Sequence, residues 1–125
     1  MANILIVTNN PLVKDINNAD YQETDLLAVL YRVRDLIHKG HRLISHPLAG
    51  SVKPNETPYK SVVVTRDADP AVDFDSLRII EGSIQVAAKM LQDRPLPAWD
   101  NKVRADFQFI DNALLSSALQ SLSHT

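Results

Sequence analysis

Nine polar residues of the chain have the side chains to hold a small anion or to move a proton. Two asparagines follow the first apolar run and seven residues lie between positions 46 and 60, the set being Asn9, Asn10, His46, Ser51, Lys53, Asn55, Glu56, Tyr59 and Lys60. Lysine attracts carboxylates and phosphates, while histidine and glutamate transfer protons where the geometry permits it. We predict that the nine residues form one ligand-binding neighbourhood, and the sequence assigns no catalytic residue.

The segment from residue 46 to residue 61 has the composition of a shaped loop. It contains three of the seven prolines and one of the three glycines, and it follows neither a helical nor a strand period. A loop of this length inside a compact domain is usually either functional or disordered. Leu48, Val52 and Tyr59, together with the stiffening prolines, favour an ordered surface. We therefore predict a binding surface at residues 46–60.

Three short apolar runs predict the strands that position these residues, at 3–8, 42–45 and 61–65. Ligands of open α/β sheets bind beyond the carboxyl ends of the strands. The asparagines after the first strand and His46 after the second should therefore share one edge. Asn10 and Pro11 also predict a short helix, whose free backbone N–H groups would face an anion. The alternative is that Asn9 and Asn10 only shape a turn and cap that helix.

Apolar residues at helical spacing predict three longer helices, at residues 25–39, 74–92 and 101–122. Thr24 would cap the first helix and Gly40 would end it. Residues 19–23 and the proline-rich residues 94–99 are expected to be connections. The last helix has a second apolar edge, formed by Leu115, Leu119 and Leu122. That edge would pack either on the preceding helix or against another subunit, which makes a homo-oligomer through the C-terminal helices one candidate assembly.

The order of these elements predicts one α/β domain over residues 1–125. We expect two or three layers, with helices flanking a three-stranded, mainly parallel sheet. The strands at 3–8 and 42–45 would form a right-handed βαβ unit and run parallel, while the direction of the third strand stays open. The sheet and the long loop would occupy residues 1–72, and the two C-terminal helices residues 73–125.

Composition excludes several classes of chemistry. The chain has no cysteine, so disulfides, thiolate metal sites and cysteine nucleophiles are absent. No apolar run is long enough to span a bilayer, and the N-terminus does not have the pattern of a signal peptide. These features predict a cytoplasmic protein that does not enter membranes. His38, His41 and His46 are spaced too widely along helix, turn and strand to share one metal ion. The sequence also contains neither GxGxxG nor GxxxxGK[ST], and we predict no metal and no cofactor.

Charge is unevenly distributed along the chain. The net charge is −2, which argues against a general nucleic-acid binder. Residues 32–66 nevertheless hold seven Lys and Arg against two acidic residues. This basic middle would attract a small anionic ligand or an acidic partner, and its alternative is an ordinary solvated mixture of charges.

Three stretches resemble the GrdX family, at residues 4–13, at residues 33–43, and from His46 to Ser61. The resemblance covers residues 3–92 and is most specific in the long loop, while the connection at residues 19–24 is shorter than the family leads us to expect. Family members are small proteins encoded beside the glycine, sarcosine and betaine reductase components of amino-acid-fermenting anaerobes. The resemblance implies an accessory part in reductive amino-acid metabolism and carries over no reaction and no catalytic residue.

Three hypotheses follow. The first is an accessory or regulatory binding protein that acts through residues 46–60 on reductase components or on a small anion. The second is a small enzyme acting on a carboxylate or phosphate metabolite through His46, Lys53, Glu56 or Lys60. The third, based only on the basic middle, is an RNA-binding accessory protein. A concave pocket with loop side chains turned inward would indicate the enzyme. A flatter surface with exposed Leu48, Val52 or Tyr59 would indicate the partner-binding protein, and a continuous basic face the RNA binder.

Overall fold

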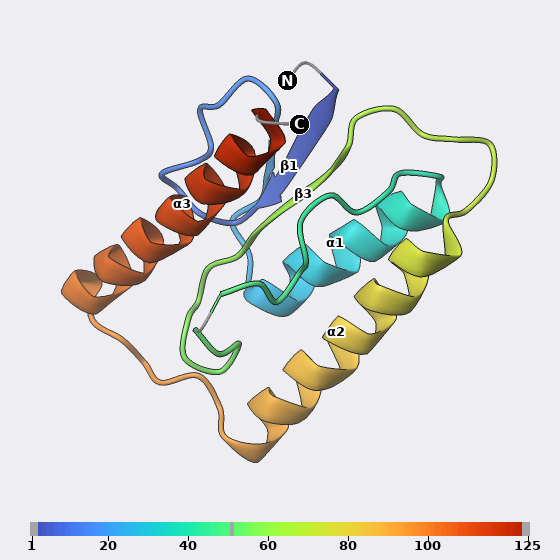
Figure 1. Ribbon diagram of the computed structural model, residues 1–125. Helices are drawn as coiled ribbons and strands as arrows, with labels where there is room; N and C mark the ends of the chain where they lie inside the picture. The colour runs from blue at the N-terminus through green and yellow to red at the C-terminus, as the bar shows by residue number, and fades with distance from the viewer. Residues whose placement is uncertain (1–2, 51, 124–125) are drawn as a thin grey trace.

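The computed structural model describes residues 3–50 and 52–123 and has helices on both faces of a small sheet (Figure 1). In chain order the elements are β1 (Ile4–Thr8), β2 (Ala19–Tyr21), α1 (Leu26–His38), β3 (Ser61–Thr65), α2 (Phe74–Asp93) and α3 (Asn101–Ser123). The strand order is β2-β1-β3. The α/β class is confirmed, and no helix of the described residues has the length and apolar character to cross a membrane.

The sheet is mixed, so the expectation of a mainly parallel sheet is wrong. The central strand β1 pairs in parallel with β2, with Ile6 opposite Ala19, and antiparallel with β3, with Ile6 opposite Val63. The long loop returns the chain to β3 without a crossover helix. A connection of that kind permits the antiparallel direction, whereas a parallel neighbour requires a crossover.

Residues 9–23 differ from the prediction in two ways. No helix begins at Pro11, because the segment is a series of turns in which Val13 N donates to the carbonyl of Asn10 at 3.0 Å and Ile16 N to that of Val13 at 3.1 Å. The expected connection at 19–23 instead contains the edge strand β2. The chain must come back beside β1 by residue 19, and a fully buried Val13 anchors the turns on the way, which leaves no room for a helix.

Residues 42–45 form a single bridge between Leu43 and Val64 instead of the expected strand. This segment runs beside β3, where Ile44 N and Ser45 N both donate to the carbonyl of Val63. Leu43 N donates to the Ser76 hydroxyl of α2 at 2.9 Å, so side-chain bonding replaces a regular ladder. The predicted βαβ unit is therefore wrong, because residues 42–45 are not a parallel neighbour of β1.

The three long helices are confirmed to within a few residues at each end. The N-cap of α1 is Asp25, whose Oδ1 accepts the N–H of Ala28 at 2.8 Å, one residue later than the predicted Thr24. Gly40 follows the helix with φ of 110°, a conformation that side-chain-bearing residues rarely adopt. The predicted linker at residues 94–99 separates α2 from α3 without regular structure.

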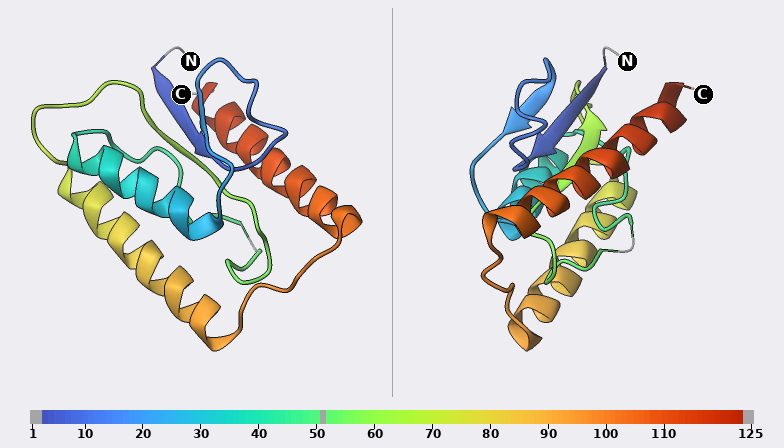
Figure 2. Two further views of the ribbon diagram at one scale, coloured as in Figure 1. Left: turned by 180° about the vertical axis from the view of Figure 1, so that it is seen from behind. Right: turned by 90° about the vertical axis from the view of Figure 1, so that its left-hand side faces the viewer.

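Two cores lie on opposite faces of the sheet, and together they make three layers (Figure 2). On one face, α1 and the adjoining α2 cover Val62 and Val64. On the other face, α3 covers Val63, chiefly with Leu115. The stripe containing Leu115 thus packs on the sheet, not on α2, while Phe109 is left 69% exposed.

Candidate functional site

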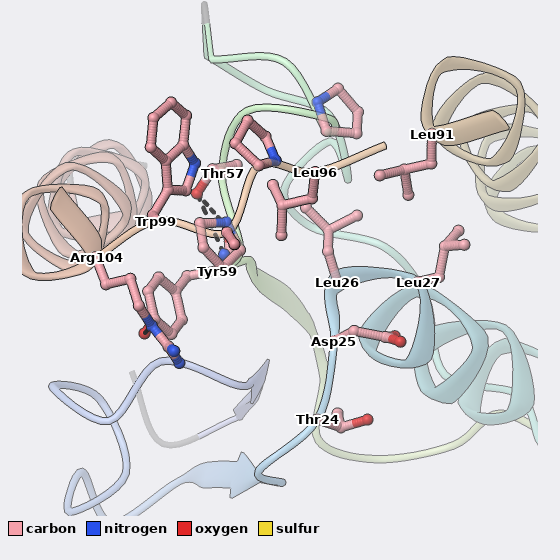
Figure 3. Close-up of a pocket in the computed structure, with 14 residues that line it drawn as sticks. Thr24, Asp25, Leu26, Leu27, Thr57, Tyr59, Leu91, Leu96, Trp99 and Arg104 are labelled. Carbon is pink, nitrogen blue, oxygen red and sulfur yellow. Dashed lines mark hydrogen bonds between the residues drawn. The ribbon is translucent and has the colours of Figure 1, made fainter. Parts of the chain in front are cut away.

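A cleft of about 560 Å³ opens where the end of the long loop meets the start of α1, the end of α2, the linker and α3 (Figure 3). Its lining is mostly apolar and includes three prolines, and it consists of Thr24, Asp25, Leu26, Leu27, Pro54, Thr57, Pro58, Tyr59, Leu91, Leu96, Pro97, Ala98, Trp99 and Arg104. Five separate segments of the chain therefore build one concave surface of the size that small ligands occupy.

The polar side of the cleft is built around the Tyr59 hydroxyl. Gln108 Nε2 donates to this oxygen at 2.8 Å and Arg104 Nε donates to it at 3.3 Å. The hydrogen bond with Tyr59 raises the pKa of Arg104, so the guanidinium is charged throughout the physiological range. Arg104 is exposed at the cleft, where it provides a positive charge to an incoming group.

Trp99 ties the linker to the long loop. Its indole Nε1 donates to the carbonyl of Glu56 at 2.7 Å, and its ring centroid lies 5.8 Å from that of Phe107 in a tilted arrangement. One face of the cleft is therefore an aromatic side chain held between the loop and α3. Figure 3 shows Trp99, Tyr59 and Arg104 along one side of the cleft and leucines from α1, α2 and the linker along the other.

The long loop is ordered by its own polar contacts. Lys53 N donates to Glu56 Oε1 at 3.3 Å, and Glu56 N donates to the carbonyl of Lys53 at 2.9 Å, which closes a turn. The buried Asn55 donates from Nδ2 to the carbonyl of Met90 at 3.2 Å, which joins this turn to α2. The loop is thus an ordered segment that is held by hydrogen bonds within itself and to α2.

Asn9 and Asn10 join the backbone segments that surround the site. Asn9 Nδ2 donates to the carbonyls of Thr24 at 2.8 Å and Pro58 at 2.9 Å, and its Oδ1 accepts the N–H of Lys60 at 2.9 Å. Asn10 is fully buried and donates from Nδ2 to Asp111 Oδ2 at 2.9 Å. The polar atoms of both side chains are therefore engaged with the protein itself.

A second, smaller hollow lies on the α3 side of the loop, with a volume of about 30 Å³. Lys60 and His46 both line it, together with Asp111 of α3. Lys60 is only 7% exposed. Burial lowers the pKa of Lys60, and the nearby Asp111 carboxylate opposes that shift in part.

The structure thus distributes the nine predicted residues over several places. Tyr59 lines the cleft, His46 and Lys60 line the small hollow, and Asn9 and Asn10 lie buried between them. Asn55 and Glu56 bond within the protein and Lys53 is exposed, while Ser51 lies outside the described residues. Their role in ligand binding stays a prediction.

Sequence reasoning missed the linker and α3 as parts of the site. The residues it did not identify include Leu96, Trp99 and Arg104, all more than thirty positions from the long loop. One signal was present, because Trp99 is the single tryptophan of the chain and follows a proline-rich segment. Large aromatic residues are enriched at the centre of binding surfaces.

Three arginines of the basic middle are paired with carboxylates from other parts of the chain. Arg32 pairs with Asp20 at 2.9 Å, and Arg34 with Glu81 at 3.3 Å. Arg42 lies 3.5 Å from a carboxylate oxygen of Asp73. These contacts neutralise part of the positive charge that the sequence concentrates between residues 32 and 66.

A comparison with protein-family models matches residues 5–120 to the GrdX-like protein family. No curated protein and no solved structure gives a significant match. The match spans β1 through most of α3 and so includes every segment that lines the cleft.

Proposed function

Since the chain belongs to the GrdX-like protein family, we propose that it is an accessory binding protein of the glycine, sarcosine and betaine reductase system. The cleft beside the long loop is the docking site, and its occupant is an apolar segment of one reductase component. The observation that carries the proposal is the lining of the cleft of about 560 Å³, which has an aromatic wall and a leucine wall. The residues of the enzyme hypothesis do not line it, namely His46, Lys53, Glu56 and Lys60.

The chemistry of the lining favours an apolar occupant. Leu27, Leu91 and Leu96 are half-buried in the free protein, so each has apolar surface left to cover. Removing such surface from water contributes roughly 25 cal/mol per Å². Tryptophan and tyrosine at the centre of an interface commonly carry a large share of the binding energy. Trp99 lines the cleft and is half-buried, so it has surface left for a partner to cover, whereas Tyr59 is already buried.

The site is preorganised, which reduces the cost of binding. Asn9 fastens Pro58 to the end of β1, and Trp99 fastens Glu56 to the linker. A wall that is already ordered loses less conformational entropy when a partner arrives. The long loop therefore supports recognition chiefly through Pro58, because its other lining residues are buried, and its exposed Lys53 lies outside the cleft lining.

Charge at the rim orients the partner. Arg104 is positive and Asp25 supplies a carboxylate, and both line the cleft. Opposite charges at separate places on a rim favour one direction of an extended segment. In the reverse direction the charges of the segment would lie beside like charges of the rim and be repelled. We expect an acidic group of the partner beside Arg104.

Binding to purified components tests the proposal. The glycine, sarcosine and betaine reductase components are immobilised one at a time, and the affinity of the chain for each is measured. Leu96→Asp and Ala98→Asp place a charge in the cleft without altering a core residue, and each should weaken binding at least about tenfold. Phe74→Asp is the matched control, because Phe74 is 79% exposed at the other end of α2, about 26 Å along the helix from Leu91.

The binding results that support the proposal differ from those that reject it. The proposal is supported if one component binds the parent and Phe74→Asp with similar affinity and binds both cleft variants weakly. It is rejected if no component binds the parent chain, or if the cleft variants bind as well as the parent.

A further inference from the structure

The small hollow beside Lys60 contains hydrogen-bond donors without an acceptor. Within residues 3–50 and 52–123, the Lys60 ammonium group forms neither a hydrogen bond nor an ion pair. A buried charge without a partner is unfavourable, and such groups are normally paired or hydrogen-bonded. Among the described residues the fully buried side-chain atom without a partner is Asn55 Oδ1, so the Lys60 ammonium group keeps contact with solvent through the hollow, where an oxygen acceptor can approach it.

Asp111 does not meet that requirement, although it lines the same hollow. Its Oδ1 accepts the N–H of Ser61 at 3.0 Å. Its Oδ2 accepts the Ser61 hydroxyl at 2.7 Å and Asn10 Nδ2 at 2.9 Å. These donors engage both oxygens of the carboxylate, and its effect on Lys60 is electrostatic, because it opposes part of the lowering of the lysine pKa that burial causes.

Two further donors line the hollow. The Ser45 hydroxyl accepts the N–H of Val63 at 2.8 Å, and its own hydrogen has no acceptor among the residues that the structure describes. His46 Nδ1 accepts the N–H of Leu48 at 3.0 Å, which places the proton of the neutral ring on Nε2. Residues that carry an ammonium group, a hydroxyl and an imidazole N–H therefore line the same hollow.

We propose that this hollow is a binding site for the carboxylate head group of a small organic acid. Lys60 supplies the charge, and Ser45 and His46 supply hydrogen bonds. Asp111 accepts hydrogen bonds from Ser61 and Asn10, so these two donors are already engaged. Leu114, Leu115 and Ala118 of α3 close the apolar side. The site is distinct from the docking cleft and does not depend on the function proposed for it.

The size of the hollow favours a carboxylate over a phosphate. A volume of about 30 Å³ admits roughly two water-sized groups. Two carboxylate oxygens meet that limit, whereas a tetrahedral phosphate has four oxygens to accommodate. The remainder of the acid would extend outward past the exposed His46 and Ala49.

NMR of the lysine side chains tests the site directly. Sodium acetate and sodium formate are titrated against sodium chloride at constant ionic strength, and the Lys60 Cε–H signal of the parent protein is followed. We expect a saturable shift with either carboxylate and a rise of the Lys60 pKa, because the anion binds the charged amine. Sodium phosphate should bind with an affinity at least about tenfold lower than that of either carboxylate.

Variants identify the residues involved. Their acetate affinity is measured from the backbone amide signals of His46 and Ala49, because Lys60→Met has no lysine signal to follow. Lys60→Met and Ser45→Ala should each reduce acetate affinity, Lys60→Met by about tenfold or more, as expected for a charge-assisted bond. Lys53→Met removes an exposed lysine of the same loop and should leave the affinity unchanged. The proposal is overturned if acetate and chloride act alike on the Lys60 signal, if phosphate binds as tightly as acetate, or if Lys60→Met retains the parent's affinity.

Discussion

Asn9 and Lys60 hold each other through two hydrogen bonds of opposite direction. Asn9 N donates to the carbonyl of Lys60 at 3.4 Å, and Lys60 N donates to the side-chain oxygen of Asn9 at 2.9 Å. The same Asn9 side chain reaches Thr24 and Pro58 with its amide nitrogen. A single residue thus fixes the end of β1, the start of α1 and the end of the long loop, which are the parts that support the cleft.

Asn9→Ala should destabilise the fold strongly. The substitution leaves the buried N–H of Lys60 and the carbonyls of Thr24 and Pro58 without partners. Each unsatisfied buried group costs about 1–3 kcal/mol, and we expect a loss of about 2–4 kcal/mol in the free energy of unfolding, measured by urea denaturation. Asn17→Ala, at an exposed asparagine of the turns that follow β1, is the control and should change the free energy of unfolding by less than about 0.5 kcal/mol. Equal stabilities of the two variants would contradict this assignment.

Two glycines should respond to alanine in opposite directions. Gly40 has φ of 110°, and an added Cβ would collide with the backbone carbonyl of Asp69. Gly40→Ala should therefore lower the free energy of unfolding by at least about 2 kcal/mol. Gly82 lies inside α2 with no atom within 4 Å of an added Cβ, so Gly82→Ala should raise it by about 1 kcal/mol. Thermal melting of both variants checks the pair, and a stable Gly40→Ala would refute the close approach to Asp69.

Lys60 makes stability depend on alkaline pH. Burial lowers the pKa of this lysine below its ordinary value of 10.5, so between the lowered pKa and 10.5 the unfolded chain binds more protons than the folded one. The free energy of unfolding should therefore rise with pH across that window. Lys60→Met removes the buried charge, so at neutral pH this variant should be more stable than the parent, and the difference should shrink as pH approaches 10.5.

Denaturation at pH 7 and pH 10 measures this effect. Lys53→Met is the control, because Lys53 is exposed and should give the same pH dependence as the parent. A Lys60→Met protein that is less stable than the parent at pH 7 would show that the lysine has a stabilising partner. It would argue against an unpaired lysine charge in the hollow.

Much of the fold follows from local sequence patterns. β1 and β3 are runs of β-branched residues, and the three long helices have clear apolar stripes, so their positions could be predicted closely. β2 could not, because Ala19–Tyr21 has no strand pattern and becomes a strand only by pairing with β1. The antiparallel direction of β3 is equally a tertiary property.

The orientation of α3 shows a second limit. Its sequence has two apolar stripes, and either could face the sheet. Leu115 is buried on Val63, whereas Ile110 and Leu114 are left 38% and 37% exposed. Asp111 explains the choice, because its bonds to Asn10 and Ser61 require that edge of the helix to lie against the strand ends.

The candidate site was predictable only in part. The long loop and the turn after β1 are neighbours, but not through the parallel pairing that was predicted. The antiparallel β3 begins where β1 ends, with Ser61 opposite Thr8, and Asn9 bonds both Pro58 and Lys60. The opposite wall of the cleft comes from the linker and α3, and no local pattern places Trp99 over Glu56. Contacts across more than forty residues depend on how the helices pack, which sequence periodicity does not specify.

The proposal that the cleft is the docking site can be tested with Trp99, the single tryptophan of the chain, because this residue lines the cleft. The protein is labelled with 5-fluorotryptophan, and the one fluorine resonance of Trp99 is followed while each unlabelled reductase component is added. We predict that one component shifts or broadens this resonance in a saturable way, and that Leu96→Asp abolishes the effect while Phe74→Asp preserves it. An unchanged Trp99 resonance in the presence of a component that demonstrably binds the chain would contradict the account.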